Sequence, residues 1–306
     1  MGLFQKIKRY AALSTGNFDK LFKDKEIPTL PEVVMKLLER LKNPDVHLED
    51  VASIVETDPG LSAQVLKMAN SPLYGFRSEI KNVKHAISAL GLKRLEQIAI
   101  SYGVKKAVKD PKAEGFDFNL FWSTSLYRAI MSKEISIATG VGGPDEAFTG
   151  ALLQDIALPV LLKDWYREYK HVYDKWKSGR EPLSKVEERT LSWTHAQAGA
   201  WMAKRWGFPA MLICCIGLHP EPLEKAQKLG LGTTAVVPVM LSQRIPMRFP
   251  ESEMEGLAAE LDRVGLTMDR LLKIEEKSYE TLLSLASTFN IRSVKVKRLQ
   301  EQLQKA

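Results

Sequence analysis

Apolar residues recur every three or four positions along most of this chain, and this spacing limits the possible folds more than any other feature. Such positions share one face of an α-helix. The pattern is clear near the start of the chain, at Val33, Val34, Leu37, Leu38 and Leu41. A half-buried strand would instead alternate polar and apolar residues, and no stretch of strand length does so. The sequence therefore predicts an all-α protein.

Residues that begin or end helices divide this pattern into segments. Asp58 followed by Pro59 is typical of an N-cap and a first-turn proline. Thr194 and Gln197 have the spacing of a capping box, in which each side chain bonds the backbone near the other. Gly91 and Gly140 are expected to end helices over residues 83–90 and 118–139.

The 306 residues are enough for about two domains. Residues 110–115 are turn-forming, charged and poor in apolar side chains, so they form the best internal boundary. We expect a helical lobe at 22–110, a second at 115–245, and a C-terminal helical extension with a basic tail at 246–306.

Residues 1–21 are expected to form an amphipathic arm. Its apolar residues are Leu3, Phe4, Ile7 and Tyr10, and its cations are Lys6, Lys8 and Arg9. The arm either contacts a membrane surface or packs its apolar side on the domain, and we favour packing. Its apolar face is too short for stable membrane insertion.

Composition excludes several classes of protein. Hydrophobic residues are 45% and charged residues 26%, which is ordinary for a globular protein and rules out a largely disordered one. The only cysteines, Cys214 and Cys215, are adjacent, so a disulfide scaffold is excluded and a cytoplasmic location is expected. We expect both to pack in a core.

The aromatic segment 165–176 either packs in the core, which we favour, or marks a partner surface.

Residues 77–109 hold eight cations and only two acids. The candidate anion-binding residues are Arg77, Lys81, Lys84, Lys93 and Arg94. One interpretation is a surface for an anionic ligand such as a cyclic dinucleotide. The other, which we favour, is the solvated side of two helices. The segment lacks a series of aromatic side chains interleaved with its cations for base stacking, so no nucleic acid is expected.

A series of motifs appears in a fixed order between residues 25 and 225. The motifs are Ile27-Pro28-Thr29-Leu30-Pro31, Glu56-Thr57-Asp58-Pro59-Gly60-Leu61, Ala69-Asn70-Ser71, Ala86-Ile87-Ser88-Ala89-Leu90-Gly91, Phe121-Trp122, Gln154-Asp155, His195-Ala196-Gln197-Ala198-Gly199, Trp206-Gly207-Phe208-Pro209 and His219. Together they resemble the HDOD family, the HD-related output domain of bacterial signalling proteins. The resemblance implies that the second lobe is a degenerate form of the HD phosphohydrolase bundle.

The resemblance also marks the positions where HD phosphohydrolases hold metal ions. Three of them keep metal-binding side chains: Asp155, His195 and His219. The other positions have Thr124, Gln154 and Pro220, and the expected late aspartate is missing from the helix around 236–242. His195 falls in the first turn of its helix, where the helix dipole disfavours a charged ring, so a neutral imidazole is expected.

We therefore expect a catalytically inactive regulatory module that holds no cofactor and binds other signalling proteins, such as kinases or cyclic-dinucleotide enzymes. Asp155, His195 and His219 are expected to form a hydrogen-bonded cluster in an inherited core. Two alternatives stay open. One is a metal-dependent phosphohydrolase that uses these three ligands, and the other is a receptor for an anionic nucleotide.

Overall fold

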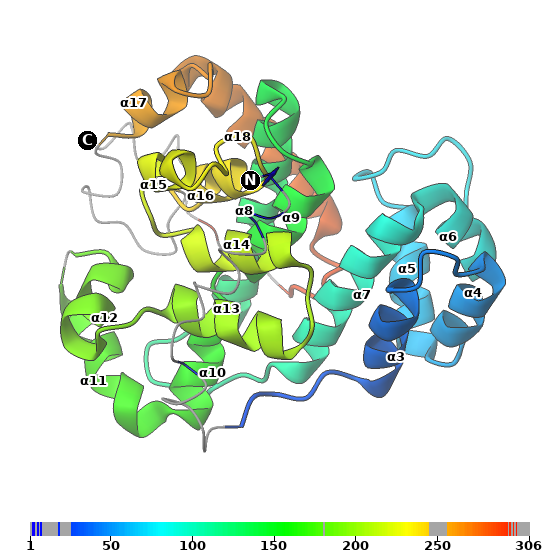
Figure 1. Cartoon of the computed structure of the whole chain (residues 1–306), viewed down its shortest axis with the longest axis horizontal. Coiled ribbons are helices and arrows are strands. Elements are labelled where there is room, and N and C mark those ends of the chain that lie inside the picture. Colours follow the sequence, from blue (N-terminus) through cyan, green and yellow to red (C-terminus); the bar gives the residue numbers. More distant parts are fainter. Residues whose placement is uncertain are drawn as a thin grey trace. The chain divides into compact units, whose positions relative to one another are not determined.

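The computed structural model describes residues 26–179, 181–244 and 256–292, together with Gly2, Leu3, Gln5, Ile7, Phe18, Val294, Val296 and Arg298. Within these residues every regular element is a helix and no strand occurs, as the all-α prediction requires (Figure 1). The chain forms two compact units. One comprises Met1–Ile27, Asp110–Leu282 and Ser293–Ala306, and the other comprises Pro28–Lys109 and Leu283–Arg292.

The smaller unit is built from short amphipathic helices and the end of the last helix of the chain. Its helices are α3 (Glu32–Leu41), α4 (Leu48–Glu56), α5 (Pro59–Ala69), α6 (Val83–Leu90) and α7 (Leu92–Ala107). Val34, Leu37, Val51, Leu61 and Leu95 are completely buried in its core. The apolar stripe of each helix therefore faces inward, as its sequence spacing predicts.

Local capping residues fix the ends of these helices. The carboxylate of Asp58 accepts a hydrogen bond of 2.6 Å from the backbone N–H of Leu61 at the start of α5. Gly91 has a φ of 81°, which an L-residue rarely adopts, and it ends α6 and precedes α7. Both expected caps are confirmed.

The larger unit is arranged around α8 (Phe118–Thr139), a long helix that is buried over most of its length. Gly140 ends it in the left-handed conformation, as expected. The helices that follow are α9 (Pro144–Leu153), α10 (Ala157–Asp164), α11 (Tyr166–Ser178), α12 (Leu183–Leu191), α13 (His195–Arg205), α14 (Ala210–Leu218), α15 (Leu223–Lys228), α16 (Val236–Ser242), α17 (Leu257–Asp262) and α18 (Met268–Leu285). Of these, α9 and α16 pack directly on α8, and α14 packs on α9, α13 and α16.

The two cysteines lie in the core of this unit. Both are free and completely buried. Gly150 of α9 meets Cys215 of α14, and a Cβ at Gly150 would lie only 2.7 Å from the Cys215 Cβ. The pair therefore has the packing role expected from the sequence, and glycine at 150 is what allows α9 and α14 to approach.

The aromatic residues of α11 are mostly core residues. Tyr169 and Tyr173 are buried, as is Trp165 just before the helix, whereas Tyr166 is 38% exposed. Trp193 packs against both Trp165 and Tyr169. The core interpretation of this segment is confirmed.

Few residues of the N-terminal arm and the C-terminal tail are described. Ile7 and Phe18 are buried, Phe18 packs edge-on against Trp193, and Leu3 is exposed. These contacts agree with an arm that packs on its own domain. Phe4, Lys6, Lys8, Arg9 and Tyr10 of the arm lie outside the described residues, as does most of the basic tail. The segment expected as a separate C-terminal extension contributes to both units, because the unit boundary falls within α18.

Candidate functional site

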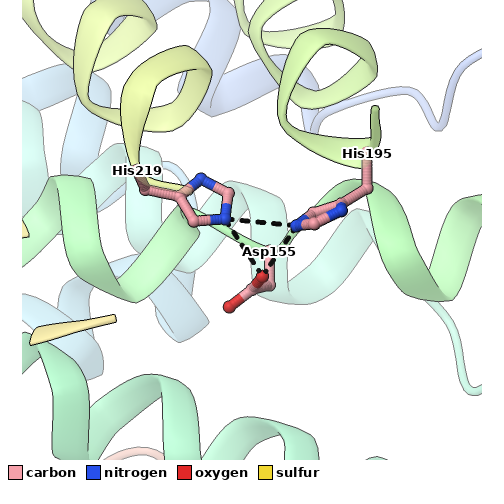
Figure 2. A group of neighbouring side chains, drawn as sticks. All are labelled: Asp155, His195 and His219. Atoms are coloured by element: carbon pink, nitrogen blue, oxygen red, sulfur yellow. Dashed lines mark hydrogen bonds and ion pairs between the residues drawn. The ribbon is translucent and has the colours of Figure 1, made fainter. Parts of the chain in front are cut away.

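Asp155, His195 and His219 meet in the interior of the larger unit (Figure 2). The His195 Nε2 lies 3.1 Å from the His219 Nε2. The Asp155 Oδ1 lies 3.3 Å from the first nitrogen and 3.4 Å from the second. All three side chains are buried. The three residues that the family resemblance singled out thus converge, although they come from three separate segments of the chain.

Local structure at helix ends aims these side chains at one point. Asp155 lies in the turn between α9 and α10, and its side chain does not cap α10. His195 is the first residue of α13, which the capping box of Thr194 and Gln197 fixes as predicted. His219 is the C-cap residue of α14.

The outer ring nitrogen of each histidine is held by an acceptor. The Nδ1 of His195 lies 2.6 Å from a carboxylate oxygen of Glu187, which also accepts the backbone N–H of His195 at 3.0 Å. The Nδ1 of His219 lies 2.7 Å from the backbone carbonyl of Ile216. A carbonyl oxygen only accepts, so the proton of His219 is on Nδ1 and its Nε2 presents a lone pair to the cluster.

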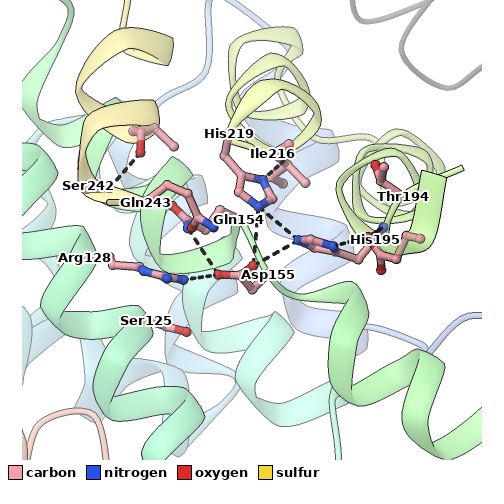
Figure 3. A network of polar contacts seen from close by, with 12 residues as sticks. Ser125, Arg128, Gln154, Asp155, Thr194, His195, Ile216, His219, Ser242 and Gln243 are labelled. Carbon is pink, nitrogen blue, oxygen red and sulfur yellow. Dashed lines mark hydrogen bonds and ion pairs between the residues drawn. The ribbon is translucent and has the colours of Figure 1, made fainter. Parts of the chain in front are cut away.

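Arg128 on α8 binds the other oxygen of Asp155. Its Nη1 donates to the Asp155 Oδ2 at 2.5 Å, and both side chains are only 3% exposed (Figure 3). The Gln154 amide donates to the same carboxylate oxygen at 3.2 Å and also to the side chain of Gln243, just after α16. The Asp155 carboxylate is therefore bonded on one side by Arg128 and Gln154 and on the other by the two histidines.

Burial and nearby charges shift the pKa values within the cluster in different directions. Burial alone would raise the pKa of Asp155, but Arg128 and the two histidines outweigh it and hold that pKa well below its ordinary value. Burial would lower the pKa of His195, but Glu187 and Asp155 overcome this and raise it to about 10. Burial dominates at His219 and lowers its pKa.

The expectation of a neutral ring at His195 is therefore wrong. The helix dipole is a weak effect beside two buried carboxylates in direct contact with the imidazole. At neutral pH the ring is an imidazolium. Its Nε2–H points at the Nε2 of His219 and the Oδ1 of Asp155. This single proton therefore provides a donor for two acceptor atoms, the His219 Nε2 and the Asp155 Oδ1.

The same three atoms also fit one small metal ion. Ligands at about 2.0–2.1 Å from a tetrahedral zinc ion lie about 3.4 Å from each other, and the three separations here are 3.1, 3.3 and 3.4 Å. Glu187 and the Ile216 carbonyl orient the two imidazoles as outer partners of a metal site do. The donor set therefore fits a single ion, provided that the shared proton leaves.

The remaining positions do not fit the larger ligand set of an HD phosphohydrolase. Thr124 is buried on α8, but its hydroxyl has no hydrogen-bond partner among the described residues and makes no bond to the cluster. Gln154 donates to Asp155 where that family has a histidine. Pro220 has no side-chain donor atom, and α16 contains no acid. A second ion would also face the guanidinium of Arg128.

Arg128, Glu187 and Gln243 belong to this network but were not predicted. For Arg128 and Glu187, the position on a buried helix face could have indicated a role in the core. Arg128 lies on the same helix face as Phe121 and Thr124, at a spacing of seven and four residues, and a charge on a buried face requires a partner. Glu187 lies one helical turn after the buried Leu183 and is itself completely buried. Nothing in the sequence near Gln243 indicates that it reaches Gln154.

The candidate anion-binding residues belong to the smaller unit and not to this cluster. Lys81 pairs with Glu79 at 3.8 Å, and Lys84 pairs with Glu49 at 2.7 Å. The guanidinium of Arg94 lies 5.3 Å from the centre of the Tyr74 ring. Lys81 and Lys84 thus take part in exposed ion pairs with carboxylates of the same unit.

The HDOD domain model matches residues 27–222, which is more than half of the chain. The chain belongs to the HDOD family. Asp155, His195 and His219, together with Arg128 and Glu187, lie within the matched residues, whereas Gln243 lies beyond them.

Other proteins resemble this HDOD chain over much of its length. An uncharacterized protein of Treponema pallidum (strain Nichols) is 24% identical over 200 residues, which is 63% of this chain but only 37% of that protein. An HDOD domain protein of unknown function from Geobacter sulfurreducens has a TM-score of 0.66 and 22% identity, over 92% of this chain and 99% of the other.

A candidate phosphohydrolase of Shewanella amazonensis SB2B has a TM-score of 0.67 and 24% identity, over 90% of this chain and 98% of the other. A candidate signal transduction protein of Marinobacter aquaeolei VT8 has a TM-score of 0.62 and 18% identity, over 94% of this chain and 65% of the other. At these identities the solved structures establish the shared fold alone.

Within the described part of the chain, no helix combines the length and the apolar character needed to cross a membrane.

Proposed function

We propose that this HDOD chain is a regulatory module that acts by binding other molecules and does not catalyse a reaction. The observation that carries the proposal is the buried ion pair between Arg128 and Asp155. A phosphohydrolase of the HD type needs this carboxylate for a metal ion, and here a fixed guanidinium already neutralises it.

The charges of the whole cluster support the same conclusion. Asp155 and Glu187 are the two buried carboxylates, and Arg128 and the protonated His195 are the two buried cations in contact with them. Buried charges are tolerated when they are paired and hydrogen-bonded, so the cluster is stable as an element of the core. It does not need a ligand to complete it.

We propose other signalling proteins as the partners, kinases and cyclic-dinucleotide enzymes among them. Membership of the HDOD family supports this, as does the fold shared with the Marinobacter aquaeolei candidate signal transduction protein. The two free, buried thiols at Cys214 and Cys215 support a reducing compartment, and we propose the cytoplasm.

The convergence of Asp155, His195 and His219 favours a second candidate, a metal-dependent phosphohydrolase with a single ion. An ion held there would polarise a phosphoryl oxygen and lower the pKa of a bound water. Binding at pH 7 would first have to displace the proton of His195, whose pKa is raised by Glu187 and Asp155, and this competition weakens the apparent affinity for the ion. This cost makes the second candidate the less favoured one.

Hydrolysis assays separate the two candidates. The full chain would be incubated with bis(p-nitrophenyl) phosphate and with cyclic dinucleotides, in the presence of manganese, iron(II) or zinc. We expect no turnover above that of the Asp155→Asn variant. Turnover by the wild-type chain that is lost in Asp155→Asn would overturn the proposal and establish the phosphohydrolase.

A further inference from the structure

The loop between α5 and α6 is held in a defined shape (cyan in Figure 1). The side chain of Asn70 bonds the backbone of Ile80 twice, donating to its carbonyl and accepting its N–H, each at 2.8 Å. Ile80 itself is buried. The two ends of the loop are thus joined by a pair of hydrogen bonds like those between strands.

The middle of this loop exposes an aromatic residue. Residues 75–79 are all exposed, and Phe76 is 37% exposed. The Phe76 ring lies nearly parallel to that of Tyr74, with centroids 6.5 Å apart, and Arg94 of α7 lies over Tyr74. Aromatic side chains and arginine are the residue types most enriched at protein–protein interfaces. We call Tyr74, Phe76 and Arg94, together with Arg77 as the exposed neighbour of Phe76 in the chain, the Phe76 surface.

The charge of this surface is positive. Arg77 is exposed and has no ion-pair partner within the described part of the chain. Arg94 is oriented by the Tyr74 ring, and a guanidinium held in place binds a carboxylate with two parallel hydrogen bonds. A ligand for this surface therefore needs negative charge beside an apolar group.

We propose that the Phe76 surface binds an acidic segment of a partner protein, with an apolar side chain of that segment on Phe76 and its carboxylates on Arg77 and Arg94. This inference rests on the proposed function as a binding module, and it adds the place and the chemistry of the contact.

The neighbouring cations favour a protein segment over a nucleic acid. Lys81 and Lys84 are already paired with Glu79 and Glu49, so carboxylates stand beside the surface. A nucleic acid binds through a succession of phosphate contacts, and the two lysines that would continue such a series beyond Arg77 already have carboxylate partners. A short peptide needs only the two arginines and one apolar contact, which the Phe76 surface offers.

A random peptide library displayed on phage tests the proposal with the full-length chain as the target. We expect the enriched peptides to share acidic residues around an apolar one. The best of them, synthesised with a fluorescent label, is expected to lose at least about tenfold in affinity with Phe76→Ser and with Arg77→Glu. Both sites are exposed, and circular dichroism would confirm that the variants fold.

Lys109→Glu is the matched control for charge. Lys109 is an exposed cation just beyond the far end of α7, about 20 Å along that helix from Arg94. This variant is expected to bind the peptide within twofold of the wild-type chain. Loss of affinity that is equal in Lys109→Glu and Arg77→Glu would show attraction by net charge alone and would overturn the proposal.

Two other outcomes would also overturn it. One is a library that yields no enriched acidic sequence. The other is a single-stranded oligonucleotide that binds the wild-type chain and does not bind the Arg77→Glu variant, while no acidic peptide binds either protein. Both outcomes would rule out the Phe76 surface as a peptide-binding site and would say nothing about hydrolysis. The hydrolysis assays decide the proposed function separately.

Discussion

Arg128 is the single residue that most changes what the buried cluster can do. Its side chain is buried, and its Nη1 donates to the Asp155 Oδ2 at 2.5 Å. The guanidinium is always charged and cannot leave with a change of pH, unlike a metal ion or a proton. It therefore supplies permanent positive charge to a carboxylate that has no access to solvent.

Replacement of Arg128 by methionine is expected to lower the free energy of unfolding by about 3–5 kcal/mol, because Asp155 would keep a buried charge without its partner. Adding Asp155→Asn to this variant is expected to restore part of the loss, since the unpaired charge is then gone. Urea unfolding measures both effects.

Arg189→Met is the matched control for this prediction. Arg189 also binds a carboxylate with its guanidinium, that of Glu181, but both side chains are more than half exposed. A much smaller change in the free energy of unfolding is expected there, because water screens an exposed ion pair. Equal effects at Arg128 and Arg189 would contradict the account of the buried pair.

The imidazolium of His195 predicts a dependence of stability on pH. The pKa of His195 is raised to about 10 in the folded chain, above the ordinary value of 6.5. Its contribution to stability is therefore full below about pH 6.5 and is lost as the pH rises through about 10. The difference in free energy of unfolding between the wild-type chain and His195→Gln is expected to shrink between pH 7 and pH 10.5.

Urea unfolding at the two pH values tests this, and taking the difference between the two proteins cancels the titration of lysines and tyrosines elsewhere. A difference that is the same at pH 7 and at pH 10.5 would show that His195 is neutral in the folded chain.

At the scale of single helices, much of the structure follows from local sequence. The caps at Asp58, Gly91, Gly140 and Thr194 were predicted, because each depends on residues within one turn of the helix end. The positions of Asp155, His195 and His219 were also marked in advance, by the motifs around them.

The partners of these residues are harder to predict for a physical reason. Arg128 bonds a residue 27 positions away, and Gln154 bonds one 89 positions away. Only the packing of α8, α9 and α16 brings these side chains together, and no local pattern encodes it. The charge state of His195 could not be predicted either, because Glu187 decides it from a different helix.

The capping box of α13 links helix formation to the cluster. Thr194→Ala removes a hydrogen bond to the backbone of Gln197 next to His195, and a loss of about 1 kcal/mol in the free energy of unfolding is expected. Thr57→Ala is the control, because Thr57 is exposed and its hydroxyl bonds only a carbonyl at the end of α4. A loss at Thr57 as large as that at Thr194 would contradict the role of the capping box.

At the scale of the whole molecule, one residue of the C-terminal tail is tied into the larger unit. Arg298 donates two hydrogen bonds, of 3.2 and 3.0 Å, to the completely buried carboxylate of Glu275 on α18. Tyr127 of α8, directly before Arg128, donates to the same carboxylate. The tail residue thus compensates a charge inside the fold.

Arg298→Ala is expected to lower the free energy of unfolding by about 1–3 kcal/mol, because it leaves Glu275 buried with a single donor. The double variant with Glu275→Gln is expected to recover most of this loss. Calorimetry measures both. A double variant that is less stable than Arg298→Ala alone would contradict the explanation by an unpaired charge.

The central claim is that Arg128 and the proton of His195 compensate the charge of Asp155 in place of a metal ion. Mass spectrometry of the chain purified without chelators tests this claim by measuring its metal content. The account predicts far less than one iron, manganese or zinc per chain, and loss of any trace on dialysis. About one ion per chain that survives dialysis in the wild type and disappears in His195→Ala would contradict it.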